Sequence, residues 1–60
     1  GLRPGVRVQF EFEGQQLQGF VNRISERATV LVEDGGGVRY SDGKFYTKYY
    51  IPLAMLSVVQ

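Results

Sequence analysis

The sequence predicts an all-β domain folded as a small, strongly bent barrel of five to six short antiparallel strands. Three observations lead to this fold class: apolar and polar residues alternate near the N-terminus, Gly-containing turn signals recur, and no segment has helical periodicity over ten residues. A chain of 60 residues supports only one small core. We therefore expect one domain over residues 1–60.

A first hairpin is predicted near the N-terminus. Apolar residues alternate with polar ones from Val6 to Phe12, so four apolar side chains share one strand face. Residues 13–15 (EGQ) form a tight turn, and the chain returns along residues 17–24. Gly19 lies within this return strand and therefore indicates a bulge, a barrel corner or a close backbone approach.

The central strand is predicted at residues 28–33. This segment is β-branched and nearly all apolar, as expected of a strand covered on much of both sides. A polar turn around residues 25–27 precedes it. Residues 34–37 (DGGG) follow as a flexible loop, because neither a helix start nor a Lys-Ser/Thr pair follows to make them a phosphate cradle.

A second hairpin follows the Gly-rich segment. Residues 38–40 and 45–50 flank residues 41–44, whose Asp-Gly pair is a strong hairpin signal. Pro52 lacks an amide donor and ends the second strand. Residues 53–59 then have room for a short helical turn before the last strand.

The first hairpin resembles a known group of folds. The pattern Gly14-x-x-Leu17-x-Gly19-x-Val21-x-x-Ile24, followed by RATVLVED at residues 27–34, is similar to Src-homology-3-like (SH3-like) small barrels of the KOW and Tudor type. The spacing also resembles the barrel-like tails of some SprT-like bacterial proteins, with a weaker likeness in residues 51–56. The resemblance covers roughly residues 5–34 and implies a single SH3-like barrel of bacterial type.

Basic and aromatic residues interleave in the second hairpin. If residues 45–51 form one strand, one of its faces carries Lys44, Tyr46, Lys48 and Tyr50, and Arg39 on the neighbouring strand extends this stripe. Lysine and arginine attract phosphates without regard to sequence, and a Tyr ring can stack on a base. The sequence therefore predicts a non-catalytic module that binds DNA or RNA weakly and largely independently of sequence.

Two other interpretations of the same hairpin remain open. The lysines can protect an exposed sheet edge while the tyrosines cover it. Alternatively, Tyr46, Tyr49 and Tyr50 can form a contact surface for a protein partner or for a second copy of the chain, since Tyr is enriched at interfaces. A protein-interaction or self-association module is therefore the alternative function.

Composition argues against several other classes. The chain has no Cys and no His, so the usual zinc and haem ligand sets are excluded, and no metal or cofactor is expected. No acidic pair has a spacing that indicates a catalytic cleft, so we predict that the chain is not an enzyme. Glu11 and Glu13 are expected on one solvated strand face and to bind no metal.

Charge and hydropathy set the remaining expectations. Seven basic and six acidic residues give a net charge of +1, too balanced to indicate nucleic acid by itself. No apolar run is long enough for a membrane helix, and Gly1–Gly5 shows no secretion signal. We expect the N-terminus to be that of a trimmed domain or a tag remnant, and the protein to be cytoplasmic without membrane contact.

A second resemblance concerns an enzyme family. Residues 17–19 and 51–56 are similar to stretches of the plasmid-borne type B dihydrofolate reductases, small barrels that assemble as tetramers around a shared pore. That family has Val-Gln-Ile-Tyr before its Pro, whereas residues 48–51 here are Lys-Tyr-Tyr-Ile. The amide and the terminal Tyr that contact its ligands are absent, so a reductase-like tetramer is only a remote alternative.

Overall fold

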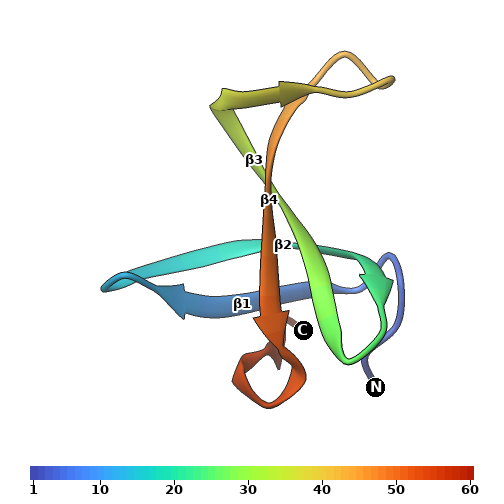
Figure 1. Ribbon diagram of the computed structural model, residues 1–60, viewed down its shortest axis with the longest axis vertical. Helices are drawn as coiled ribbons and strands as arrows, with labels where there is room; N and C mark the ends of the chain where they lie inside the picture. Colours follow the sequence, from blue (N-terminus) through green and yellow to red (C-terminus); the bar gives the residue numbers. More distant parts are fainter.

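The computed structural model describes all 60 residues, which form one strongly bent sheet (Figure 1). Its elements are β1 (Arg7–Phe12), β2 (Gln15–Ile24), β3 (Arg27–Arg39), β4 (Phe45–Pro52), the 3₁₀ turn η1 (Leu53–Met55) and β5 (Ser57–Val58). The strand order is β4-β3-β2-β1-β5, and all neighbours are antiparallel. The all-β prediction with one helical turn before the last strand is confirmed, and the sheet is compatible with a small barrel-like fold.

One face of the sheet carries the hydrophobic core. Its seven buried side chains are Val8, Phe10, Val21, Ala28, Val30, Val32 and Ile51. Alternate residues of β3 enter this core, because successive side chains of a strand point to opposite faces. Leu31 therefore points away from the core, yet it is only 3% exposed. The prediction that this strand is covered on both sides is confirmed.

The β1–β2 turn lies where the sequence predicts it. Glu13 and Gly14 have φ values of 50° and 80°, and Phe12 pairs with Gln15 across the turn. Positive φ at both central residues matches the twist of the flanking strands. Because Glu13 lies in the turn, the expectation that it shares a strand face with Glu11 is wrong.

Gly19 marks a close backbone approach between β2 and β3. A Cβ atom at this position would meet the Leu31 carbonyl oxygen and would lie 2.9 Å from the Leu31 carbonyl carbon. Only a residue without a side chain fits there. The strand-interior glycine singled out in the sequence is thus explained by packing between neighbouring strands.

A β-bulge interrupts β2 at Asn22. Val21 pairs with Val30, but the next paired residue is Arg23, which lies opposite Thr29. The extra residue shifts the alternation, so Asn22 and Arg23 follow one another on the same face. Without the bulge, Arg23 would point toward the core.

β3 continues through the Gly-rich segment, where a flexible loop was expected. Tyr46 lies opposite both Glu33 and Val38, so residues 34–37 form an excursion within the strand, which turns sharply there (Figure 1). The Asp34 carboxylate stabilises this excursion, because it accepts hydrogen bonds from the Gly36 amide (3.0 Å) and the Thr47 hydroxyl (3.3 Å). The loop prediction is therefore wrong.

The excursion is the first part of what we call the distal arm, residues 34–44. At its tip the Tyr40 amide donates to the Lys44 carbonyl (2.8 Å) and the Gly43 amide donates to the Tyr40 carbonyl (2.9 Å). Gly43 has a φ of 85°, and the Asp42 carboxylate accepts from the Lys44 amide at 2.9 Å. The predicted Asp-Gly turn is confirmed, although β3 ends at Arg39 and not at Tyr40.

The C-terminal elements form the edge of the sheet beside β1. Pro52 ends β4, and the three-residue turn η1 follows it directly. Val58 of β5 then pairs with Val8 of β1. With η1 as its only helical turn, the protein contains no helix that could cross a bilayer.

Candidate functional site

The face of the sheet opposite the core, which we call the outer face, carries charged, polar and aromatic side chains from four strands. Directly opposed residues in an antiparallel sheet point to the same side. One row across β1, β2, β3 and β4 consists of Arg7, Phe20, Leu31 and Lys48. The adjacent row across β2, β3 and β4 consists of Arg23, Thr29 and Tyr50.

Two residues of the predicted basic and aromatic stripe lie together on this face. Lys48 and Tyr50 are both exposed on β4, and Tyr50 retains 64% of its surface. They are two residues apart, so they project to the same side of the strand. The structure thus brings together one cation and one ring of the five predicted residues.

Tyr46 lies on the same side of β4 as Lys48 and Tyr50 but is covered by the distal arm, so the expectation that it presents an exposed ring there is wrong. It is only 7% exposed, and its ring packs edge-on against Phe20 (5.6 Å) and Tyr40 (5.2 Å between centroids). Its hydroxyl donates to the Asp42 carboxylate at 2.8 Å. The distal arm folds against this part of the outer face, so Tyr46 anchors the arm.

The two remaining predicted residues also leave the stripe. Arg39 lies opposite Phe45, which places it on the other side of the hairpin from Tyr46 and Lys48. Lys44 belongs to the turn of the distal arm and lines a separate small hollow with Arg7. A continuous stripe of all five residues therefore does not form.

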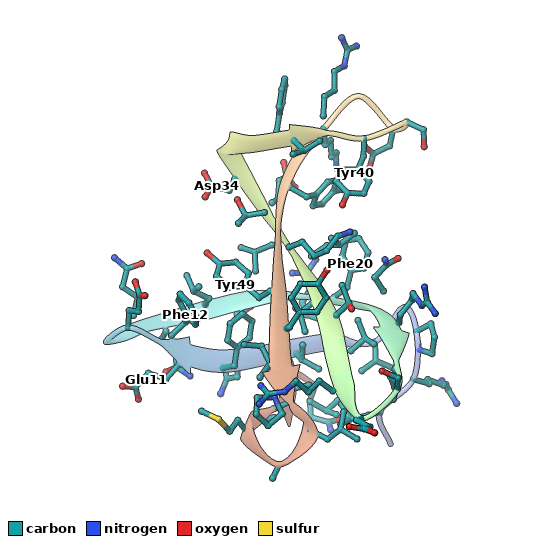
Figure 2. All side chains as sticks on the ribbon, in the orientation of Figure 1. Glu11, Phe12, Phe20, Asp34, Tyr40 and Tyr49 are labelled. Carbon is teal, nitrogen blue, oxygen red and sulfur yellow. The ribbon has the colours of Figure 1, made fainter.

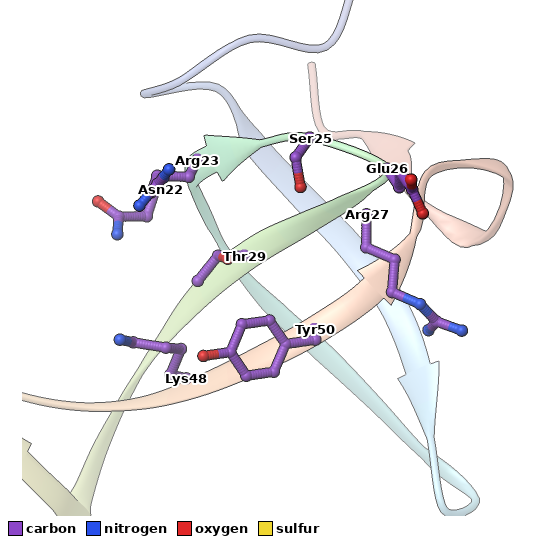
Figure 3. Close-up of a pocket in the computed structure, with 8 residues that line it drawn as sticks. All are labelled: Asn22, Arg23, Ser25, Glu26, Arg27, Thr29, Lys48 and Tyr50. Carbon is purple, nitrogen blue, oxygen red and sulfur yellow. The ribbon is translucent and has the colours of Figure 1, made fainter.

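The outer face instead has an open hollow of about 570 Å³ around Tyr50, which we call the Tyr50 hollow. Figure 3 shows the Tyr50 ring beside Lys48 of β4 and Thr29 of β3, with Arg23 coming from β2 and Arg27 from the start of β3. Three strands thus contribute three cations to the lining of the hollow around this exposed ring.

The polar lining gives the Tyr50 hollow a positive balance. Glu26 is its only acidic residue, against the three cations Arg23, Arg27 and Lys48, so its net charge is +2. Its uncharged hydrogen-bonding side chains are those of Asn22, Ser25 and Thr29, together with the Tyr50 hydroxyl. This arrangement can attract an anion and place a flat group against a ring.

Sequence reasoning missed the two arginines of this hollow. The bulge at Asn22 moves Arg23 onto the outer face, and Arg27 begins β3 opposite Pro52 instead of lying in a turn. One signal was available for Arg23. Leu17, Gly19 and Val21 are spaced by two, whereas Ile24 follows Val21 by three, and this break in alternation is typical of a bulge.

One hydrogen-bonded pair, Asp42 of the distal arm and Tyr46 of β4, has shifted pKa values. Hydrogen bonds from the Lys44 amide and from the Tyr46 hydroxyl lower the pKa of the Asp42 carboxyl below its usual 3.8. The same hydrogen bond to Asp42, together with desolvation, raises the pKa of Tyr46 above its usual 10.0. At neutral pH the pair is therefore an ionised carboxylate and a protonated phenol, which stabilises the arm.

The acidic residues do not gather into a metal site. No group of three or more Asp or Glu side chains could hold a metal ion together. Glu11 of β1 and Glu13 of the first turn are both exposed. The expectation that they are solvated agrees with this exposure.

Comparison with protein-family models, curated proteins and solved structures gives no match for this chain. The likeness to SH3-like barrels therefore stays a prediction, and the function has to be argued from the chemistry of the outer face.

Proposed function

We propose that this chain is a non-catalytic module that binds nucleic acid through the Tyr50 hollow, weakly and largely independently of sequence. One observation carries the proposal: a 64% exposed Tyr ring stands among three cations contributed by β2, β3 and β4. The pairing of Thr29 with both Arg23 and Tyr50 places the ring and one of the cations on neighbouring positions of the strand ladder.

Each residue type has a definite role in the proposal. Arg23, Arg27 and Lys48 neutralise backbone phosphates, and this attraction carries no sequence information. The Tyr50 ring offers a surface on which an unpaired base stacks, a contact that all bases can make. Few side chains remain to recognise base edges, which is why little sequence preference is expected.

The fold is consistent with this proposal. Small SH3-like barrels of the KOW and Tudor type are the group that the first hairpin resembles, and a five-stranded bent antiparallel sheet is compatible with such a barrel. A type B reductase-like activity is not proposed, because residues 48–51 lack the side chains that contact its ligands in that family.

Titration at two salt concentrations tests the proposal. A fluorescently labelled single-stranded oligonucleotide and its duplex are titrated with the protein, and the solution mass is measured in parallel. With three phosphate contacts at most, log affinity against log salt should have a slope of about −2 to −3. Undetectable binding, or affinity that does not depend on salt, contradicts the proposal. If a concentration-dependent solution mass accompanies undetectable binding, the self-association alternative is favoured.

A further inference from the structure

A second hollow adjoins the Tyr50 hollow at Lys48. It has a volume of about 430 Å³ and is lined by Gly37, Val38 and Tyr40 of the distal arm and by Tyr46, Thr47 and Lys48 of β4. We call it the arm hollow. Lys48 lines both hollows, so a ligand that fills them together passes this one ammonium group.

The arm hollow differs in character from the Tyr50 hollow. Lys48 is its only charged residue, and its walls include Val38, which is 70% exposed, and two Tyr residues. The Thr47 hydroxyl is already engaged with Asp34. An uncharged, flat or apolar group therefore suits the arm hollow, whereas the Tyr50 hollow also accommodates anions.

The arm hollow is built into the chain and does not depend on a mobile loop. A Cβ atom at Gly37 would meet the Tyr46 carbonyl oxygen and would lie 2.8 Å from the Thr47 amide nitrogen, so the arm lies directly against β4. The hydrogen bond from Tyr46 to Asp42 holds the tip of the arm. The hollow therefore exists before any ligand arrives, which reduces the entropic cost of binding.

The order of the Tyr50 hollow, Lys48 and the arm hollow matches the base and phosphate repeat of a nucleic-acid strand. Along the outer face there is an exposed ring, then the Lys48 ammonium group, then an apolar hollow, and a nucleic-acid strand presents base, phosphate and base in the same order. The proposal that follows rests on the proposed function and names its substrate class. We propose that the two hollows are adjoining subsites for consecutive unpaired nucleotides of a single strand, with Lys48 at the phosphodiester between them.

Duplex is excluded by the same geometry. A base that stacks on Tyr50 must expose its π-face, and a base in the arm hollow must leave its neighbours in the helix. In a duplex both faces of each base are already stacked, so each extrusion has to break that stacking and the base pair. Single-stranded nucleic acid is therefore the substrate class.

An NMR titration of the ¹⁵N-labelled chain with two matched ligands tests the inference. The dinucleotide TpT has one phosphodiester and two bases, whereas the methyl ester of thymidine 5′-monophosphate has the same charge and one base. We expect TpT to bind at least fivefold tighter. We also expect the one-base ligand to shift the amides of Thr29 and Tyr50, and TpT to shift those of Gly37 and Val38 as well.

A pair of variants assigns the second base to the arm hollow. Val38→Asn should bring the affinity for TpT down to that of the one-base ligand. Met55→Asn makes the same kind of change at an exposed apolar residue in η1, far from the arm (Figure 1), and should leave both affinities unchanged. Circular dichroism of both variants checks that they fold.

The outcomes separate this inference from the proposed function. Equal affinities for the two ligands, no effect of Val38→Asn on TpT binding, or a 12-base-pair duplex bound as tightly as its single strand would each overturn the inference while the proposed function stands. Failure of every oligonucleotide to bind overturns the proposed function, and the inference falls with it.

Discussion

The hydroxyl of Tyr46 donates a 2.8 Å hydrogen bond to the carboxylate of Asp42, four residues earlier in the chain. This contact joins a buried ring of the outer face to the turn of the distal arm. Figure 2 shows Tyr40 on the arm and Phe20 on β2, and the Tyr46 ring packs against both. Two contacts of Tyr46 therefore hold the distal arm against β4: its ring packs on Tyr40, and its hydroxyl makes a charge-assisted hydrogen bond to Asp42 in the turn.

The first prediction concerns the pH dependence of stability. The pKa of Asp42 is below 3.8 in the folded state, so its stabilising effect is fully present above that value and is lost as the pH falls through the folded-state pKa. Asp42→Asn should lower the urea midpoint at pH 7, and the difference from the parent chain should vanish well below pH 3.8. Glu11→Gln is the matched charge control, and a difference that persists in acid would contradict this role.

The second prediction tests the close approach at Gly19. Gly19→Val places a side chain against the Leu31 carbonyl group, so we expect it to destabilise the fold by about 1 to 3 kcal/mol. Denaturant unfolding monitored by circular dichroism measures the change. A neutral substitution would show that β2 and β3 can separate at this point without cost.

The third prediction compares two adjacent glycines of the excursion. Gly37→Ala should destabilise the chain by about 2 kcal/mol, because its Cβ would collide with the backbone of Tyr46. Gly36→Ala is the matched control, since the nearest atom to its Cβ is the Asp34 carboxylate at 3.7 Å, an ordinary contact distance. Equal unfolding midpoints for the two variants would mean that the arm does not lie against β4.

The fourth prediction concerns the exposed ring. Tyr50→Ala should weaken binding of a single-stranded oligonucleotide by about 5- to 150-fold, the effect of losing one base-stacking contact. Tyr50→Phe keeps the ring and should bind like the parent chain. Fluorescence anisotropy measures both affinities. If the two variants bind equally well, stacking on Tyr50 does not contribute.

The fifth prediction separates the cations of the outer face from Arg39. Arg23→Gln and Arg27→Gln should each weaken binding and reduce the salt slope by about 0.7 for a single strand. Arg39→Gln removes the same charge on the other side of the hairpin and should change neither quantity. An effect confined to Arg39 would favour the stripe predicted from sequence over the Tyr50 hollow.

The elements of the fold were predictable because their signals are local. Alternation from Val6 to Phe12 and the Asp42-Gly43 pair each specify a strand or a turn within a few residues. Gly19 was predicted to mark a bulge, a barrel corner or a close backbone approach, and the structure shows the last of these, with the Leu31 carbonyl group against it. The excursion at residues 34–37 was misjudged, because its stability comes from contacts with Thr47 and Tyr46, which lie on the next strand.

The candidate site was predictable only in part. Alternation correctly placed Lys48 and Tyr50 on one side of β4, but it could not show that the arm covers Tyr46 on that same side. Periodicity assigns side chains to a face, whereas burial depends on what is packed over each part of the face. The position of Arg23 depends on a one-residue bulge, whose only trace in the sequence is the spacing from Val21 to Ile24.

The excursion in β3 also separates the residues that set the strand register from the residues that line the arm hollow. Because Glu33 and Val38 share Tyr46 as their partner, the ladder from Arg27 to Glu33 needs none of the residues between them. Insertions or deletions among residues 34–37 would lengthen or shorten the part of the distal arm that lines the arm hollow, while the register between Arg27–Glu33 and β4 stays fixed. For the proposed function, the length of nucleic acid that the two hollows can take would then be adjustable at a single place, with the sheet beneath left untouched.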